Sequence, residues 1–227
     1  MEKKKINNNG HPYVDLDLPS GTLWSICNVG ANKPSAYGLY FQWGDIVGYT
    51  KEQIGNDKKF TWNSYKFRIK EKSSKVKENK QLDLSNSQYN GNEGSSKFNK
   101  YKSKGDTLEL EDDAANKNMG SAWHIPTNDQ IFELFNNTTT TWIEEDGVEG
   151  MTFTSKKDSS KSIFIPAVGS VWCSDIHFSG HYGYIYSNML NASNVSKGQF
   201  FYFNPKDADI YIDDARCIGL PVRGVIG

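Results

Sequence analysis

The sequence has few cysteines. Its 227 residues include three, Cys27, Cys173 and Cys217, and an odd number at wide spacing excludes a disulfide framework and a cysteine metal site. Buried thiols that act as small core hydrophobes are the simplest expectation. One bridge between Cys173 and Cys217 remains open, but we expect synthesis in a reducing cytoplasm. Nothing near this pair indicates a lowered thiol pKa, so a redox or copper site has little support.

Long apolar runs are also missing. No stretch reaches the roughly 18 apolar residues of a membrane-spanning helix, so we expect no membrane insertion. The N-terminal residues MEKKKINNNGHPYVDL are charged and polar but lack an apolar core. We therefore expect no secretory signal, and the initial Met favours a native start, although a chain with its signal removed would look similar.

An excess of charge is likewise lacking. The chain has 26 basic and 27 acidic residues, a formal net charge of -1. A chain so balanced has no global field that attracts it to nucleic acid. We therefore expect no nucleic-acid partner.

Aromatic residues and glycines are plentiful. Aromatic residues make up 13% of the chain, and 20 glycines accompany them. This composition is typical of short strands joined by many turns. Alternating segments lie before and after two helical segments, which predicts an α+β fold with antiparallel sheets. We expect a loose arm or connector at residues 1–12 and one domain at residues 13–227.

A lysine-rich segment interrupts this domain at residues 66–104. It holds ten lysines and Arg68 against four acidic residues, and it is rich in Ser, Asn and Gly. We interpret it as a long surface insertion. A basic loop could contact an anionic polymer, and a solvated loop without a ligand is the alternative.

The two helices are expected at residues 111–120 and from Thr127 onward. Gly120 suits the end of the first helix. Thr127 and Gln130 form a capping-box pattern at the start of the second, and apolar residues at 131, 134 and 135 share one helical face. From residue 140 onward the pattern returns to strands, beginning with a hairpin around Asp146-Gly147.

Four carboxylates, Glu109, Glu111, Asp112 and Asp113, precede the first helix. Acidic residues at a helix start are each stabilised by about 0.3–1 kcal/mol through the free backbone N–H groups and the helix dipole. A calcium loop motif is missing, and nothing indicates a catalytic pair. We expect a helix start with internal hydrogen bonds, with a structural cation at Glu111, Asp112 and Asp113 as the weaker alternative.

No other residue pattern points to catalysis. The four histidines lack zinc spacing; His177 and His181 are four apart, but in a glycine-containing stretch typical of a surface loop. No nucleophile elbow, phosphate loop or dinucleotide fingerprint occurs. We therefore expect no enzymatic activity.

Five segments, in order, carry a family resemblance. They are YVDLDLPSGTLWSICNVGA, YGLYFQWGD, LELEDDAANKNMGSAWHIPT, IFIPAVGS and ARCIGLPVRGVI. Together they resemble the "major paralogous domain" family named from Fibrobacter and abundant in gut Bacteroidetes and their phages. The resemblance spans residues 13–226. One departure is Tyr184-Ile185-Tyr186-Ser187, where the family usually has YWSS.

The resemblance implies a C-type-lectin-like fold, in which two short helices flank small antiparallel sheets and the N- and C-terminal strands pair. Related domains are binding displays on cell surfaces and phage appendages, and they are generally not enzymes. A distant branch of the fold holds formylglycine-generating oxidases, which would require Cys173 and Cys217 to lie close together beside a cleft.

In such a fold the display surface corresponds to residues 172–194 and 204–214. Tyr, Trp, Asn, Ser and Gly are the residues of adaptable binding loops. The alternative is that half of the aromatic residues are core and the asparagines only form turns. The candidate ligand-binding residues are Trp172, His177, Phe178, His181, Tyr182, Tyr184, Tyr186, Asn188, Asn191 and Asn194.

Five further residues are expected to be structural. Trp24, Trp43 and Trp123 suit the core because large aromatic side chains dominate core burial. Arg216 and Arg223 are expected to pair with Asp112 or Asp113, since a buried Arg needs such a partner.

Our leading hypothesis is a non-enzymatic attachment module of a phage virion, such as a tail or head fibre, located in the virion. It would recognise a glycan or protein of the host surface, act in oligomers and attach to other virion proteins through residues 1–12, with no cofactor required. The alternatives are a structural or decorative virion subunit and a bacterial cell-surface or secreted adhesin.

Overall fold

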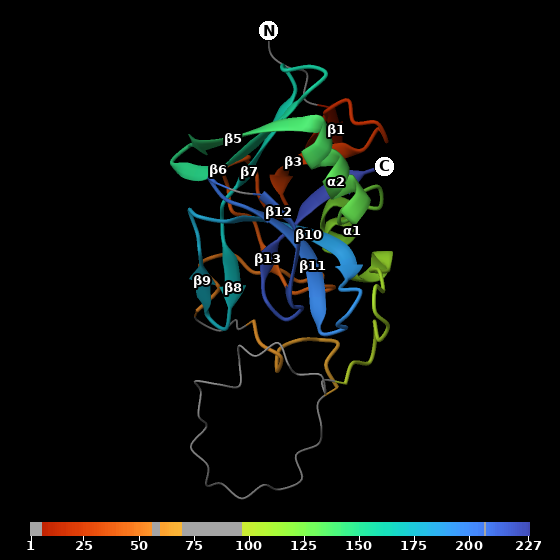
Figure 1. The fold of residues 1–227 in the computed structure, drawn as a ribbon. Helices are drawn as coiled ribbons and strands as arrows, with labels where there is room; N and C mark the ends of the chain where they lie inside the picture. The colour runs from red at the N-terminus through yellow and green to blue at the C-terminus, as the bar shows by residue number, and fades with distance from the viewer. Residues whose placement is uncertain (1–5, 56–59, 70–96, 207) are drawn as a thin grey trace, which may run out of the picture.

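The computed structural model describes residues 6–55, 60–69, 97–206 and 208–227. The fold is α+β and mainly β, with small antiparallel sheets and two short helices in these ranges (Figure 1). The helical elements are η1 (Leu110–Asp112), α1 (Ala114–Met119) and α2 (Asn128–Asn137). No helix within the described ranges is long and apolar enough to cross a bilayer.

In the part of the chain that the structure describes, five sheets hold the strands. The largest has the order β1-β2-β3-β14 and joins β1 (Ile6–Asn8), β2 (His11–Asp15), β3 (Leu23–Asn28) and β14 (Arg223–Ile226). Two three-stranded sheets contain β5 (Thr138–Glu145), β6 (Val148–Ser155) and β7 (Ser162–Pro166), and β10 (Gly183–Leu190), β11 (Lys197–Phe203) and β12 (Ala208–Ala215). The two-stranded sheets pair β13 (Leu220–Pro221) with β4 (Tyr40–Phe41) and β8 (Ser170–Trp172) with β9 (Asp175–His177).

The N-terminal segment is more ordered than the sequence suggested. Residues 6–12 do not form a loose arm, because β1 and β2 make an antiparallel hairpin. Its turn is Asn9-Gly10, with φ of 52° and 80°, and Asn-Gly is the dipeptide that favours such turns. The Asn9 amide also donates to Met119 O at 2.9 Å. Residues 1–5 of the expected arm lie outside the described part of the chain.

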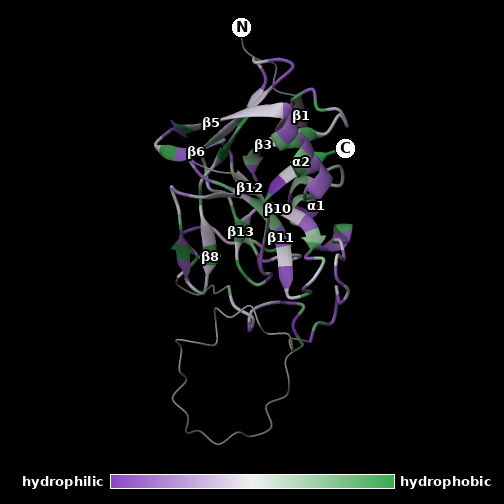
Figure 2. Cartoon of the chain, viewed as in Figure 1, coloured by the Kyte–Doolittle hydropathy of each residue, from purple (hydrophilic) through white to green (hydrophobic). Residues whose placement is uncertain are grey.

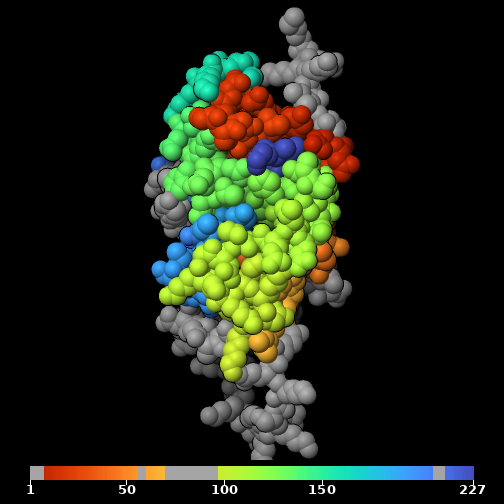
Figure 3. Space-filling view, turned by 90° about the vertical axis from the view of Figure 1, so that its right-hand side faces the viewer, coloured from red at the N-terminus to blue at the C-terminus, as the bar shows by residue number. Residues whose placement is uncertain are grey.

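The two ends of the domain share one sheet. β3 pairs with β2 on one side and with β14 on the other. The turn expected at Pro19-Ser20-Gly21 forms between β2 and β3, where Gly21 N donates to Leu18 O at 2.9 Å. Figure 3 shows the C-terminal residues, in blue, at the surface between the N-terminal residues and the helices.

α2 starts at the expected cap, whereas the helix expected at residues 111–120 is divided into η1 and the shorter α1, which starts at Ala114. Asp113 caps α1 by accepting from Asn116 N at 3.0 Å, and Gly120 ends it with a φ of 110°. Thr127 and Gln130 form the complete capping box of α2. The ribbon of α2 carries both hydrophilic and hydrophobic residues (Figure 2), and its buried residues are Ile131 and Leu134.

The β10–β11–β12 sheet lies between two hydrophobic clusters. Phe200 belongs to one cluster and its neighbour Phe201 to the other, because successive side chains of a strand point to opposite faces. Trp43 and Trp123 lie in the first cluster and Trp24 in the second, each at most 1% exposed.

The buried arginines do not pair with Asp112 or Asp113. Arg216 Nη1 donates to Tyr101 O at 3.0 Å, and its guanidinium carbon lies 3.5 Å from the Phe98 ring centroid. Arg223 donates to Ser25 O and Phe164 O. Backbone carbonyls and aromatic faces thus replace the expected carboxylates, and cation–π contact is the main compensation for burying Arg216.

The lysine-rich insertion begins and ends in the core. Residues 70–96 lie outside the described part of the chain. At the boundaries, Phe67, Phe98 and Tyr101 are buried, and Arg68 pairs with Phe98 in an antiparallel bridge. Ile69 N donates to Lys97 O at 2.8 Å, so the two ends of the insertion lie side by side.

Candidate functional site

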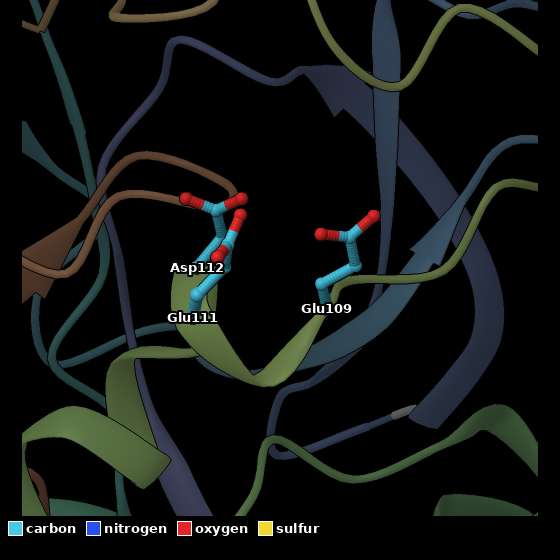
Figure 4. A group of neighbouring side chains, drawn as sticks. All are labelled: Glu109, Glu111 and Asp112. Carbon is cyan, nitrogen blue, oxygen red and sulfur yellow. The ribbon is translucent and has the colours of Figure 1, made fainter.

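The acidic cluster surrounds a lysine of its own chain. Glu109, Glu111 and Asp112 bring their carboxylates together at η1, with Glu109 facing the other two (Figure 4). Lys100 Nζ lies 2.6 Å from Glu109 Oε2, 2.5 Å from Glu111 Oε1 and 2.6 Å from Asp112 Oδ2. The ammonium group therefore occupies the position that a metal ion would take among these oxygens.

Asp112 is the most enclosed member of this cluster. Its side chain is 10% exposed, and it accepts from Lys66 Nζ at 2.7 Å and from Tyr101 Oη at 2.8 Å. Burial raises the pKa of Asp112, but the hydrogen bonds from Lys100, Lys66 and Tyr101 outweigh it and the pKa lies below its usual value. The carboxylate is therefore a firmly ionised acceptor, unsuited to general acid catalysis.

The same contacts act on the other groups. Desolvation lowers the pKa of Lys100, but the hydrogen bonds to the three carboxylates prevail and the pKa is raised above its ordinary range. Burial, with a smaller contribution from Asp112, raises the pKa of Tyr101 to about 12. Both groups hold their protons at neutral pH, so the cluster is a fixed network of charge-assisted hydrogen bonds.

Asp113 does not belong to this cluster, although the sequence grouped it with Glu111 and Asp112 as a weak cation candidate. It is 2% exposed, and besides capping α1 it accepts from Ile125 N at 2.8 Å. Burial raises the pKa of Asp113. Its role is to join the start of α1 to the segment that leads into α2.

An aromatic patch lies at the end of β9 and the start of β10. We define the aromatic patch as His177, Phe178, Tyr182 and Tyr202. Ring centroids are 6.2 Å apart for His177 and Phe178, 5.2 Å for Phe178 and Tyr182, and 5.5 Å for Tyr182 and Tyr202. Phe178 is 53% exposed, so a large apolar ring faces solvent in a continuous set of aromatic contacts.

The turn that presents Phe178 is held on both sides. His181 N and Tyr182 N both donate to Phe178 O at 3.0 Å. Gly180 N donates to Ala167 O at 2.7 Å, and Gly169 N donates to Tyr182 O at 3.0 Å. These bonds fix the turn against residues 167–169.

Two backbone features show that the turn is tightly constrained. Phe178 has a φ of 60°, a left-handed conformation that is unfavourable for a bulky side chain and marks local strain. Gly169 has a φ of 73°, and a Cβ placed there would lie 2.1 Å from His177 O. Residue 169 must therefore be glycine for the backbone of the turn to lie this close to it.

The expected display surface is divided. β10, which has eight residues and spans about 25 Å at 3.3 Å per residue, separates the aromatic patch from the asparagines that follow it. Exposed His181 lies in the patch turn. Asn188, Asn191 and Asn194 lie at the other end of β10 or beyond it. The ten candidate residues thus do not form one surface.

The asparagines beyond β10 mainly hold turns. Asn191 Oδ1 accepts from Ser193 N and Asn194 N at 2.7 and 2.8 Å, and Asn194 Oδ1 accepts from Ser196 N at 2.9 Å. Asn188 is half-buried, and its backbone bonds to Pro126 and Leu108. These contacts match the turn-forming alternative.

Three of the aromatic candidate residues differ in how deeply their side chains are buried. Tyr186 is 2% exposed and donates to Ile218 O at 3.3 Å, so it belongs to the core and cannot contact a ligand. Trp172 and Tyr184 are half-buried and pack against the same hydrophobic cluster. Tyr184 lies opposite Tyr202 in the β10–β11 register.

Tyr202 is the patch residue that sequence reasoning missed. It lies on β11 in the run Phe200-Phe201-Tyr202-Phe203, whose other members are buried. Alternation places Phe200 and Tyr202 on one face, but nothing in the sequence indicates where the cluster beneath that face ends. The one sequence feature that could have indicated an exposed position is the hydroxyl group of Tyr202 within an otherwise apolar run.

No family model, curated protein or solved structure matches the chain in the three comparisons. The function must therefore be inferred from the residues and their geometry.

Proposed function

We propose that the chain is a non-enzymatic binding module that attaches a phage virion to its host through the aromatic patch. The ligand is a glycan or protein of the host cell surface. The observation that carries the proposal is the exposed ring of Phe178, held in a left-handed conformation on a hydrogen-bonded turn. Strained backbone positions gather at functional sites, and this one presents an aromatic ring to solvent within a continuous set of aromatic contacts.

The chemistry of the patch fits a saccharide. The apolar C–H faces of a sugar ring pack on aromatic faces. In the patch, the imidazole of His177 and three aromatic rings lie next to one another, each in contact with the next. The Tyr hydroxyls and the His ring nitrogens can bond to sugar hydroxyl groups. Because the turn is already fixed, little conformational entropy is lost on binding.

We propose, further, that the fold is C-type-lectin-like. Three features support it: the pairing of β3 near the N-terminus with β14 near the C-terminus, the two short helices, and the separate small antiparallel sheets between them. The display surface of that fold includes the segment that carries Phe178 and Tyr182.

The cysteines give little support to an oxidase of the formylglycine-generating type. That chemistry requires two accessible thiols beside a cleft. Cys217 is 0% exposed and Cys173 is half-buried on the β8–β9 turn, and no disulfide forms among the three cysteines.

The first test is binding of the purified chain to intact gut Bacteroidetes cells, before and after removal of the capsule. The variants are Phe178→Gly and Tyr182→Ser. Leu110→Ser is the matched control, because Leu110 is 58% exposed but lies at η1. We expect each patch variant to bind about thirtyfold more weakly or worse, as for the loss of an aromatic anchor, and the control to bind like the wild type.

Capsule-dependent binding would identify a glycan ligand, and binding that persists on stripped cells would indicate a protein. Equal binding by Phe178→Gly and the wild type would refute the assignment to the aromatic patch. If the folded wild type binds no cells yet assembles into virions, the chain is a structural virion subunit.

A further inference from the structure

Strand β5 has a free edge. It pairs with β6 through eight consecutive residues without a bulge, and it is the last strand of its sheet in the described part of the chain. Its sequence, TTTTWIEE, contains no proline or lysine, the residues that usually protect an exposed edge. β5 runs near the top of the molecule in Figure 1 and is mostly pale in Figure 2, as expected for threonine.

The hairpin register shows which backbone groups face outward. Glu145 and Val148 close the two-residue turn Asp146-Gly147, so they form a hydrogen-bonded pair. Such pairs alternate along an antiparallel ladder. The N–H and C=O groups of Thr140, Trp142 and Glu144 therefore point away from β6, and no backbone bond to another described segment reaches them.

The exposed side chains of β5 favour pairing with another strand. Thr139, Thr140, Thr141 and Ile143 are exposed, and β-branched residues pack well against neighbours across a strand pair. Trp142 is half-buried and packs against the core, which fixes the face of the strand that points inward.

Charges lie at the two ends of this edge. Glu144 and Glu145 lie at the hairpin end. Lys156 and Lys157 are exposed at the other end, where Lys156 N donates to Asn137 O at 3.0 Å and Lys156 Nζ to Asn136 O at 2.7 Å. An antiparallel neighbour of identical sequence places its lysine pair, which lies one strand in from its β5 edge, at the same end of the dimer as this glutamate pair, and its glutamates at the same end as these lysines.

We propose that β5 pairs with β5 of a second copy about a two-fold axis, joining two three-stranded sheets into one of six strands. A register centred on Trp142 places Glu144 opposite Thr140 of the second copy, so no like charges face each other. The charge pattern is self-complementary in the antiparallel arrangement and not in a parallel one, and a two-fold axis perpendicular to the strands generates the antiparallel arrangement. This inference is independent of the ligand of the aromatic patch.

The decisive experiment is a charge exchange measured by sedimentation velocity of the whole chain. One variant carries Glu144→Lys and Glu145→Lys, and the other carries Lys156→Glu and Lys157→Glu. Each variant alone places like charges at both ends of the dimer, whereas an equal mixture restores opposite charges at both. Lys102→Glu with Lys104→Glu is the control for net charge at exposed lysines in another region.

We expect the wild type and the control to dimerise reversibly. Each charge variant alone should dimerise about tenfold more weakly or worse, since charges of like sign then gather at both ends of the dimer, and the mixture should dimerise as heterodimers. The difference should shrink in high salt. Thr140→Pro, which removes an outward N–H without breaking the β5–β6 ladder, should also prevent dimerisation.

Three results would overturn the proposal. They are a wild type that stays monomeric at the highest concentration reached, a mixture that fails to associate, and a dimer unaffected by Thr140→Pro and by both charge variants. The last result would show that the copies meet through another surface.

Discussion

Replacement of Lys100 by methionine removes the ammonium group that three carboxylates share. Methionine keeps the length of the aliphatic stem, so packing changes little and the charge is the main loss. Glu109, Glu111 and Asp112 then repel one another, and only Lys66 remains bonded to Asp112 as a cation.

The expected loss of stability follows from the exposure of each partner. Glu109 and Glu111 are 62% and 67% exposed, so solvent screening leaves their ion pairs little weight in the stability. The charge-assisted bond to the enclosed Asp112 contributes about 2 kcal/mol. The unfolding free energy should therefore fall by about 2 kcal/mol at pH 7, which lowers Tm by about 4–8 °C in a chain of this size.

The effect should depend on pH in one direction. Asp112 and Glu111 have lowered pKa values in the folded state. Their contribution is present above the pKa of the unfolded state, about 4, and is lost as the pH falls through the folded-state pKa. Lys100 has a raised pKa, so its contribution is fully present at pH 7 and is lost only at strongly alkaline pH. The gap between wild type and variant should shrink below about pH 4.

Urea unfolding of both chains between pH 3 and pH 8 measures this gap. Lys102→Met is the control, because Lys102 is exposed and forms no ion pair with a described residue. An unchanged unfolding free energy for Lys100→Met at pH 7, or a gap that widens toward pH 3, would show that the cluster does not depend on its lysine.

Three further predictions concern other parts of the fold. Phe178→Gly should change the unfolding free energy by less than about 1 kcal/mol, since relief of the left-handed conformation offsets the lost ring contact; a larger loss in urea unfolding would make the ring structural. Arg216→Met should cost less than about 2 kcal/mol, and Arg216→Lys should cost more, because a compact ammonium group needs stronger hydration than aromatic faces provide; the reverse order of Tm would contradict this. Replacement of residues 70–96 by Asn-Gly should leave the chain folded by circular dichroism, since Ile69 N already donates to Lys97 O, as in the closing pair of a two-residue turn. An unfolded product would show that the segment is required.

Local signals in the sequence predicted much of the secondary structure. The caps at Thr127 and Gly120 and the hairpin at Asp146-Gly147 depend on residues within a few positions of one another. Asn9-Gly10 was an equally local signal for the first hairpin, and the polar composition around it concealed it.

Contacts between distant residues could not be predicted in this way. Tyr184 and Tyr186 share one face of β10, yet only Tyr186 is fully covered, because burial depends on where the neighbouring elements end along the strand. Lys66 is 46 residues from Asp112, and nothing in the sequence pairs them. The rings of Tyr65 and Phe98 contact the guanidinium group of Arg216, so the expected carboxylate partner was wrong.

The shared terminal sheet has a mechanical consequence. β2, β3 and β14 form one hydrogen-bonded ladder, in which Leu23 lies opposite Ile226. A force that pulls residue 6 away from residue 227 is carried first by this ladder. The strands beneath the aromatic patch belong to two other sheets, β8–β9 and β10–β11–β12, and lie off the direct path of tension. A ligand held there would meet an undistorted surface while the ends of the domain are under load.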